Sequence, residues 1–273
     1  MPGTAKLRRP WRGEKLGIAW AITMGILYVP FSILVKSRYR NLDKLPQGTG
    51  AIIVVNHVSH ADPFLVAKMI IDGARRPRFL AKDTLFTTPI VGAAMSGMGH
   101  IPVKRGTTDA RESLGAAVDA LRAGGLIVLH PEGTVTRDPD GWPMIGKTGA
   151  ARLAMLAPEI PVIPIAQWGV QEQVNLYQKK IKLVPRPKHV MSVGAPIDLS
   201  EFAGRDTDAE TLHQVTDVIM RRLRSDVADL RGLPAPTGDL YYWVRPADEP
   251  SDDLRKDDSH KRLRRVTGHR GKK

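Results

Sequence analysis

The chain has 273 residues, of which 42% are hydrophobic, so it is long enough to bury one sizeable core. It contains no cysteine, which excludes disulfide frameworks, thiolate metal sites and cysteine nucleophiles. The 41 Lys and Arg residues outnumber the 28 Asp and Glu residues, and the resulting charge of +13 favours anionic partners such as nucleic acid, anionic lipid or phosphorylated substrates.

The first predicted element is an uncharged apolar segment, residues 16–35, which has about the length of a membrane span when helical. Basic residues flank both of its ends and Pro30 predicts a kink, so a full span and a helix that dips into one leaflet both stay open. A buried core helix is the third interpretation. We predict that residues 1–45 are a basic N-terminus with a membrane-associated helical segment, as a monotopic or singly anchored element at the cytoplasmic face.

From Gly50 onward, short β-branched runs alternate with helical stretches, which predicts an α/β fold with a mixed, mostly parallel sheet flanked by helices. The predicted strands are residues 51–55, 78–80, 100–103, 126–130, 162–165, 181–184 and 190–193. The predicted helices are residues 63–71, 109–123 and 206–230. Residues 46–233 are thus expected to form one catalytic domain, and the charged residues 234–273 a C-terminal extension, a disordered basic tail.

A polar cluster, Asn56-His57-Val58-Ser59-His60-Ala61-Asp62, follows the first strand of this domain. Open α/β sheets bind ligands at the carboxyl ends of their strands. There His57 could take the proton of an attacking hydroxyl, while Asp62 holds the tautomer of the imidazole. Backbone N–H groups of the turn after His57 are candidate donors to the developing oxyanion.

Other interpretations of this cluster stay open. Asp62 precedes a proline and could serve only as the N-cap of the next helix. His57, His60 and Asp62 could bind zinc, although their spacing does not match the usual metallohydrolase ligands, and we predict no metal site. The histidines could also be buried polar groups with a purely structural role.

Two later motifs carry further candidate residues. In His130-Pro131-Glu132-Gly133-Thr134, the carboxylate could hold a substrate hydroxyl, and glycine permits a close backbone approach. In residues 99–106, a strand is followed by Lys104 and Arg105, and the planar guanidinium of arginine suits phosphate oxygens. Lys82 and Lys147 are weaker phosphate candidates.

Taken together, four ordered blocks resemble the motifs of the 1-acylglycerol-3-phosphate acyltransferase family. The blocks are Asn-His-x-Ser-His-x-Asp, Gly-x-Ile-x-Val-x-Arg, Pro-Glu-Gly-Thr and Ile-Pro-Val-Ile-Pro, and they span residues 50–165. The third block departs from the family pattern, because His130 replaces a phenylalanine, Val135 follows Thr134, and the arginine is delayed to Arg137.

The resemblance implies that His57 is the general base and that Asp62 is its partner. It also implies that Arg105 binds the glycerol phosphate and that Glu132 and Gly133 line the acceptor site. It implies acyl transfer from acyl-CoA or acyl carrier protein to lysophosphatidate, without cofactor or metal, at an anionic membrane surface. Glycerol 3-phosphate or a glycolipid sugar is the alternative acceptor. A non-catalytic basic membrane-binding protein is the alternative of another class. Nucleic acid is not an expected partner, since aromatic residues make up only 5% of the chain.

Overall fold

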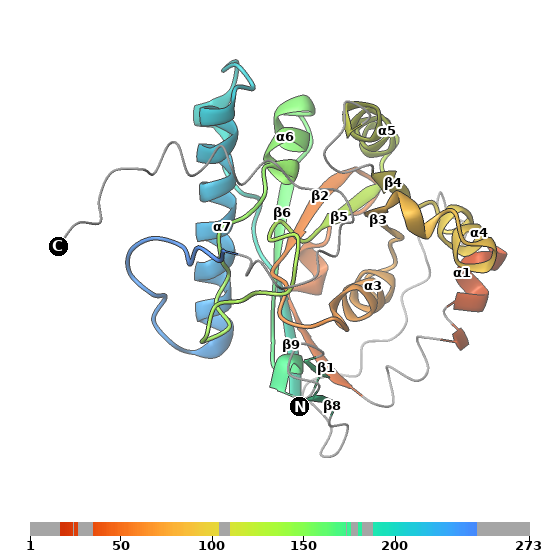
Figure 1. The fold of residues 1–273 in the computed structure, drawn as a ribbon, viewed down its shortest axis with the longest axis horizontal. Helices are drawn as coiled ribbons and strands as arrows, with labels where there is room; N and C mark the ends of the chain where they lie inside the picture. The colour runs from red at the N-terminus through yellow and green to blue at the C-terminus, as the bar shows by residue number, and fades with distance from the viewer. Residues whose placement is uncertain are drawn as a thin grey trace.

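The structure is a computed structural model, and it describes residues 17–23, 25–26, 35–103, 110–172, 174–175, 180–181 and 188–244. Within these residues a seven-stranded sheet has the order β1-β9-β6-β2-β5-β3-β4. All neighbouring strands are parallel except β6 and β9, which are antiparallel. The prediction of an α/β fold with a mixed, mostly parallel sheet is therefore confirmed (Figure 1).

The strands of the large sheet are β1 (Lys36–Arg40), β2 (Ala51–Val55), β3 (Pro77–Lys82), β4 (Ile101–Val103), β5 (Leu126–Leu129), β6 (Val162–Trp168) and β9 (Lys188–Val193). A second, two-stranded sheet consists of β7 (Val174–Asn175) and β8 (Lys180–Ile181). Strand β2 lies in the middle of the large sheet and is buried along its whole length, as its run of apolar residues predicts.

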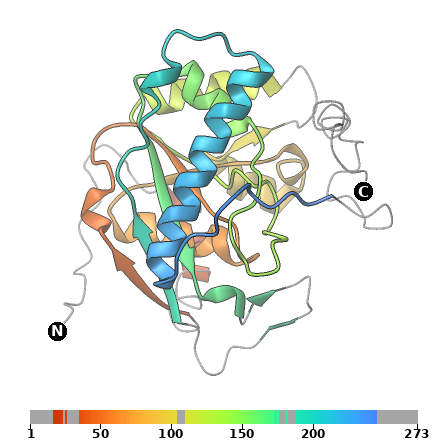
Figure 2. The ribbon, with the colours of Figure 1, turned by 90° about the vertical axis from the view of Figure 1, so that its left-hand side faces the viewer.

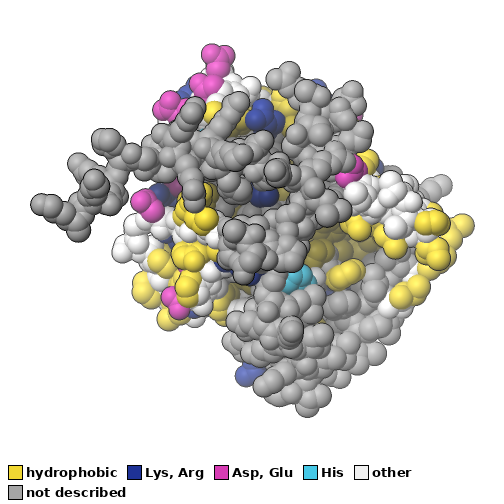
Figure 3. All heavy atoms as spheres, viewed as in Figure 1, with side chains coloured by type: hydrophobic (Ala, Val, Ile, Leu, Met, Phe, Trp, Pro, Cys, Tyr) yellow, Lys and Arg dark blue, Asp and Glu magenta, His cyan; other side chains and the backbone are white. Residues whose placement is uncertain are grey.

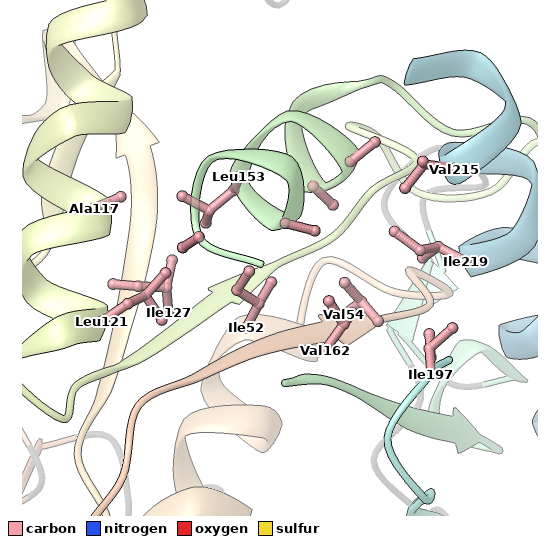
Figure 4. Close-up of a cluster of buried hydrophobic side chains, with 14 of the residues drawn as sticks. Ile52, Val54, Ala117, Leu121, Ile127, Leu153, Val162, Ile197, Val215 and Ile219 are labelled. Carbon is pink, nitrogen blue, oxygen red and sulfur yellow. The ribbon is translucent and has the colours of Figure 1, made fainter. Parts of the chain in front are cut away.

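Helices cover both faces of the sheet. Alternate residues of β2 contact different helices: Ile53 packs in the same cluster as Met69 of α3 (Asp62–Asp72). Ile52 packs on the other face, against the helices α5 (Ala110–Arg122), α6 (Gly149–Leu156) and α7 (Ala209–Arg231). Figure 4 shows this second cluster, in which side chains from these helices meet those of β2, β5 and β6.

Helix α7 is the longest described helix and runs along the sheet (Figure 2). Its first turn is capped by Asp208, whose side chain accepts a 2.7 Å hydrogen bond from the backbone N–H of Thr211. The helix ends at Gly232, whose φ of 64° suits glycine at a C-terminal cap. Both signals are local, which explains why the helix predicted over residues 206–230 matches so closely.

The N-terminal helix α1 (Ile18–Thr23) packs beside α4 (Pro89–Gly97). Trp20 is 2% exposed, and its indole Nε1 donates a 2.9 Å hydrogen bond to the carbonyl of Met98. No helix in the described ranges is both long and apolar enough to cross a bilayer. The rest of the apolar segment lies outside the described residues, so its membrane association stays a prediction.

Several elements differ from the sequence-based prediction. Strand β1 and helices α4 and α6 were not predicted, and Asp62 is the first residue of α3 rather than its N-cap, which is Ala61. Most of the strand predicted at residues 181–184 lies outside the described residues. Within the predicted C-terminal extension, Leu240 is buried and Tyr241 forms a β-bridge with Met144.

Candidate active site

The first polar cluster forms a closed hydrogen-bonded turn between β2 and α3. The Nδ1 atom of His57 lies 2.9 Å from Oδ2 of Asp62, so the structure brings together the two residues that the sequence singled out. The same oxygen accepts the backbone N–H groups of Val58, at 2.7 Å, and Ser59, at 2.8 Å. Asp62 therefore holds both the imidazole and the backbone of the turn.

These contacts correct one sequence-based hypothesis. The N–H groups of Val58 and Ser59 were candidate donors to an oxyanion, yet both already bind Asp62. The N–H of His57 itself donates to Oε1 of Glu132 at 2.9 Å. These three N–H groups form hydrogen bonds that fix the shape of the turn, so they cannot also stabilise charge on a substrate.

Burial sets the protonation of the pair. Burial, with a smaller contribution from the nearby His60, lowers the pKa of His57 to about 3. The imidazole is therefore neutral at neutral pH. Because Oδ2 of Asp62 accepts two backbone N–H groups, it also accepts the proton of Nδ1, which leaves the lone pair of His57 on Nε2. With 15% of its side chain exposed, the ring can meet a substrate hydroxyl.

The pKa of Asp62 shifts in the opposite direction. Burial raises it to about 7, whereas His130 and the N–H groups of Ser59 and Val58 lower it. The carboxylate form of Asp62 is thus fully populated only above neutral pH, where it best stabilises an imidazolium. One oxygen, Oδ1, is buried with no hydrogen-bond partner.

Glu132 lies in the turn after β5, the neighbour of β2 in the sheet. Its side chain is 2% exposed, and burial raises its pKa well above the usual range, which favours the neutral form of the carboxyl. One carboxyl oxygen, Oε1, supports the backbone of His57, and the other, Oε2, is buried with no partner. An oxygen in this position is available to a substrate hydroxyl.

His130 is a site residue whose role sequence reasoning missed. Its ring stacks on that of His57, with centroids 4.3 Å apart and planes inclined by 23°. Nδ1 lies 3.1 Å from the carbonyl of Val55, an acceptor, so this nitrogen carries the proton and the buried Nε2 is an acceptor with no partner. Burial lowers the pKa of His130 to about 3, with His57 contributing. The feature of the sequence that could have indicated this role is His130 itself, which stands where the family pattern has phenylalanine.

A buried polar network on the other side of His57 was also missed. The amide of Asn56 exchanges hydrogen bonds with the backbone of Gln167, at 2.8 and 3.0 Å, and the amide nitrogen of Gln167 donates to the carbonyl of Asn56 at 2.7 Å. Oε1 of Gln167 lies 3.2 Å from Nε2 of His189, whose Nδ1 lies 3.0 Å from the hydroxyl of Ser37. These four residues fix the backbone immediately before His57.

The loop between β5 and α6, residues 130–148, is fastened to the rest of the site. The N–H of Thr136 donates a 2.7 Å hydrogen bond to the carbonyl of His57. Arg231, at the end of α7, lies between two indoles, with its guanidinium 4.0 Å from the ring centre of Trp142 and 3.9 Å from that of Trp168. The β-bridge between Met144 and Tyr241 holds the loop at a third point.

The structure describes only some of the residues that the sequence predicts to bind the substrate. Lys104 and Arg105 lie outside the described residues, directly after β4, so their role stays a prediction. Lys82 ends β3, where it pairs with Val103 of β4, and its role in phosphate binding stays a prediction. Thr134 follows Gly133 in the turn and is half-buried.

Gly133 has a backbone conformation that favours glycine, and a lysine side chain lies close to it. Its φ is 71°, and a Cβ at this position would lie only 2.8 Å from Cδ and Cε of Lys147. The side chain of Lys147 therefore passes close to Gly133, and the approach of a ligand to this glycine stays a prediction. In the described part of the chain, no group of three or more His, Asp or Glu side chains could hold a metal ion.

Comparison with known proteins connects this geometry to a family. The family model described as Acyltransferase matches residues 36–168, which include the His57 turn and Glu132. The chain is similar to a chloroplastic 1-acyl-sn-glycerol-3-phosphate acyltransferase of Arabidopsis thaliana, with 32% identity over 49% of this chain and 36% of that protein. It is also similar to the N-acylphosphatidylethanolamine synthase of Arabidopsis thaliana, with 30% identity over 60% of this chain and 63% of that one.

Among solved structures, the chain is similar to the 1-acyl-sn-glycerophosphate acyltransferase of Thermotoga maritima, with a TM-score of 0.55 and 21% identity. The likeness covers 79% of this chain and 81% of the other, and it shows a shared fold. The chain spans less than two thirds of the length of the curated relatives that it matches.

Proposed function

Because residues 36–168 match the Acyltransferase family model and the chain is similar to 1-acyl-sn-glycerol-3-phosphate acyltransferases, we propose that it acylates a glycerol hydroxyl of lysophosphatidate to give phosphatidate. The acyl donor is acyl-CoA or acyl carrier protein. The observation that carries the proposal is the 2.9 Å contact between His57 and Asp62, beside a buried carboxyl oxygen of Glu132 with no partner.

In the proposed reaction, Nε2 of His57 takes the proton of the acceptor hydroxyl while the hydroxyl oxygen attacks the thioester carbonyl. The new C–O bond forms, the C–S bond then breaks, and the thiolate leaves with the proton that His57 held. Asp62 stabilises the imidazolium that exists between the two proton transfers. The thioester is already activated, so the main contribution of the protein is to align the two substrates.

An exposed apolar surface supports a lipid substrate. Ile90 and Val91 of α4 and Ile18 and Ile22 of α1 are between 48% and 86% exposed, although both helices pack on the folded domain. Figure 3 shows apolar side chains gathered over α1 and α4. Phe64, two residues after Asp62, is 42% exposed. We propose that this surface contacts the bilayer, so that lipid substrates reach the site from the membrane.

The acceptor is identified by a parallel assay. The purified protein is offered lysophosphatidate, glycerol 3-phosphate, lysophosphatidylethanolamine and a glycolipid, each with acyl-CoA or acyl carrier protein, and products are identified by mass. We expect phosphatidate from lysophosphatidate as the main product. A different main product would reassign the acceptor, and no product with any pair would contradict the proposed transferase activity.

The membrane surface is tested separately by flotation with phosphatidylglycerol vesicles. Ile18→Asp and Ile90→Asp should reduce the bound fraction, because each places a charge on the proposed lipid-facing surface. Leu156→Asp is the matched control, since Leu156 is 44% exposed on α6, away from this surface. Equal binding by all three variants would contradict the assignment of this surface.

A further inference from the structure

Lys147 occupies a position that the proposed mechanism does not use. Its backbone N–H donates a 2.7 Å hydrogen bond to the carbonyl of Pro131, next to Glu132. Its side chain is exposed and runs across Gly133, where Cδ and Cε lie within 2.8 Å of the place that a Cβ would take. The ammonium group is therefore held at the Glu132 turn, which directly supports the backbone of His57.

The local charges favour an anion at this point. Burial raises the pKa of Glu132 well above its usual range, which disfavours a negative charge on this carboxyl beside Lys147. Oε2 of Glu132 is buried without a partner and can share a bound polar ligand. A Cβ on Gly149, two residues after Lys147, would meet no atom within 4 Å, so the start of α6 is open at this residue.

The N-terminus of α6 also favours a bound anion. The helix begins at Gly149, and the side chain of Thr148 does not cap it, so the first N–H groups of the helix add partial positive charge. This effect is secondary to the full charge of Lys147. Lys147 lies two residues before the start of this helix in the chain.

We propose that Lys147 binds the phosphate of the acceptor and so selects phosphorylated acceptors over neutral ones. The inference rests on the proposed function and deepens it by assigning acceptor selectivity to a residue on the loop between β5 and α6. Gly133 contributes to the same selectivity, because a side chain at that position would displace the side chain of Lys147.

The test compares lysophosphatidate with the monoacylglycerol of the same acyl chain, both in the same detergent. Lys147→Met keeps the stem over Gly133 and removes the charge, and Lys147→Arg keeps the charge. We expect Lys147→Met to lower kcat/KM for lysophosphatidate about ten- to a hundredfold, the loss typical of a hydrogen bond to a charged group, with little change for monoacylglycerol. Lys147→Arg should restore part of the loss.

Lys44→Met is the matched control, because Lys44 is an exposed lysine in the short helix η2 (Leu42–Lys44), after the edge strand β1. An equal loss with both acceptors in Lys147→Met would show a structural role and overturn the inference. A wild-type protein that prefers monoacylglycerol would overturn it too, while leaving the transferase activity intact. Failure of the wild type with both acceptors would instead contradict the proposed function itself.

Discussion

Two neighbouring residues, Asn56 and His57, lead into two buried polar regions of opposite character. The region that extends from Asn56 through Gln167 and His189 to Ser37 uses its side-chain donors and acceptors on one another. On the His57 side, three buried atoms have no partner: Oδ1 of Asp62, Nε2 of His130 and Oε2 of Glu132. A satisfied polar network stabilises a fold, whereas unsatisfied buried atoms cost free energy and are retained where a ligand can pair with them.

The largest effect is expected from a substitution in the region around His57, where buried polar atoms have no partner. His57→Gln removes the proposed base and should lower kcat about 10²- to 10⁴-fold, the usual contribution of general base catalysis. The variant should keep its far-ultraviolet circular dichroism and its vesicle binding. Initial rates with acyl-CoA measure the effect, and retention of more than a tenth of wild-type activity would remove His57 from the mechanism.

The next prediction concerns the region from Asn56 to Ser37, where the polar side chains are hydrogen-bonded to one another. Gln167→Leu removes the amide that donates to the carbonyl of Asn56 and the oxygen that pairs with Nε2 of His189, so the free energy of unfolding should fall by about 2–4 kcal/mol. Urea denaturation measures this change. Gln214→Leu, on the exposed side of α7, is the control and should change stability by less than about 0.5 kcal/mol. A stable Gln167→Leu protein would contradict the role given to the network.

The pH dependence of stability sharpens the comparison. Burial lowers the pKa of His189 to about 3, so below pH 6.5 the unfolded chain binds a proton that the folded protein does not. Stability is therefore lost as pH falls from about 6.5 toward 3, by about 1.4 kcal/mol per pH unit for this residue. His57 and His130 contribute with the same sign, while Asp62 and Glu132, with raised pKa values, offset part of the loss.

The measurement for this prediction is urea denaturation at pH 6, 5 and 4. His189→Gln lowers stability at every pH, but its stability should fall less steeply with acidification than that of the wild type. His213→Gln, which changes an exposed histidine of α7, is the control variant. Parallel slopes for wild type and His189→Gln would show that His189 does not stay neutral in the fold.

The smallest effect concerns Glu132. Because burial raises the pKa of Glu132 well above its usual range and so favours the neutral carboxyl, Glu132→Gln keeps the shape and the acceptor for the N–H of His57, and kcat/KM should change less than about tenfold. Glu132→Leu should do more, since it leaves the N–H of His57 without its acceptor at a cost of about 1–3 kcal/mol. Similar kinetics for the two variants would show that the hydrogen bond to His57 is unimportant.

Local patterns predicted much of the fold, and their failures have physical causes. Strand β2 was predicted to the residue because its apolar run is bounded by Gly50 and Asn56. Strand β1 was missed because Lys36–Arg40 is mostly polar and exposed on alternate residues, and it becomes a strand only by pairing with β9. Helix α4 is apolar on every side and shows no helical periodicity.

The candidate site divides in the same way. The pairing of His57 with Asp62 spans five residues and a single turn, so spacing was enough to predict it. The stack of His130 on His57 and the position of Lys147 over Gly133 join segments far apart in the chain. No periodicity records such contacts, because they depend on how β5 is placed beside β2 and on the path of the following loop.

The fastening of the loop between β5 and α6 has a consequence for turnover. This loop has little regular secondary structure, yet the hydrogen bond of Thr136, the indole sandwich around Arg231 and the bridge at Tyr241 hold it before any substrate arrives. The conformational entropy of ordering it is therefore lost during folding and not in each catalytic cycle. Loosening the sandwich with Arg231→Ala would transfer that entropic cost to substrate binding.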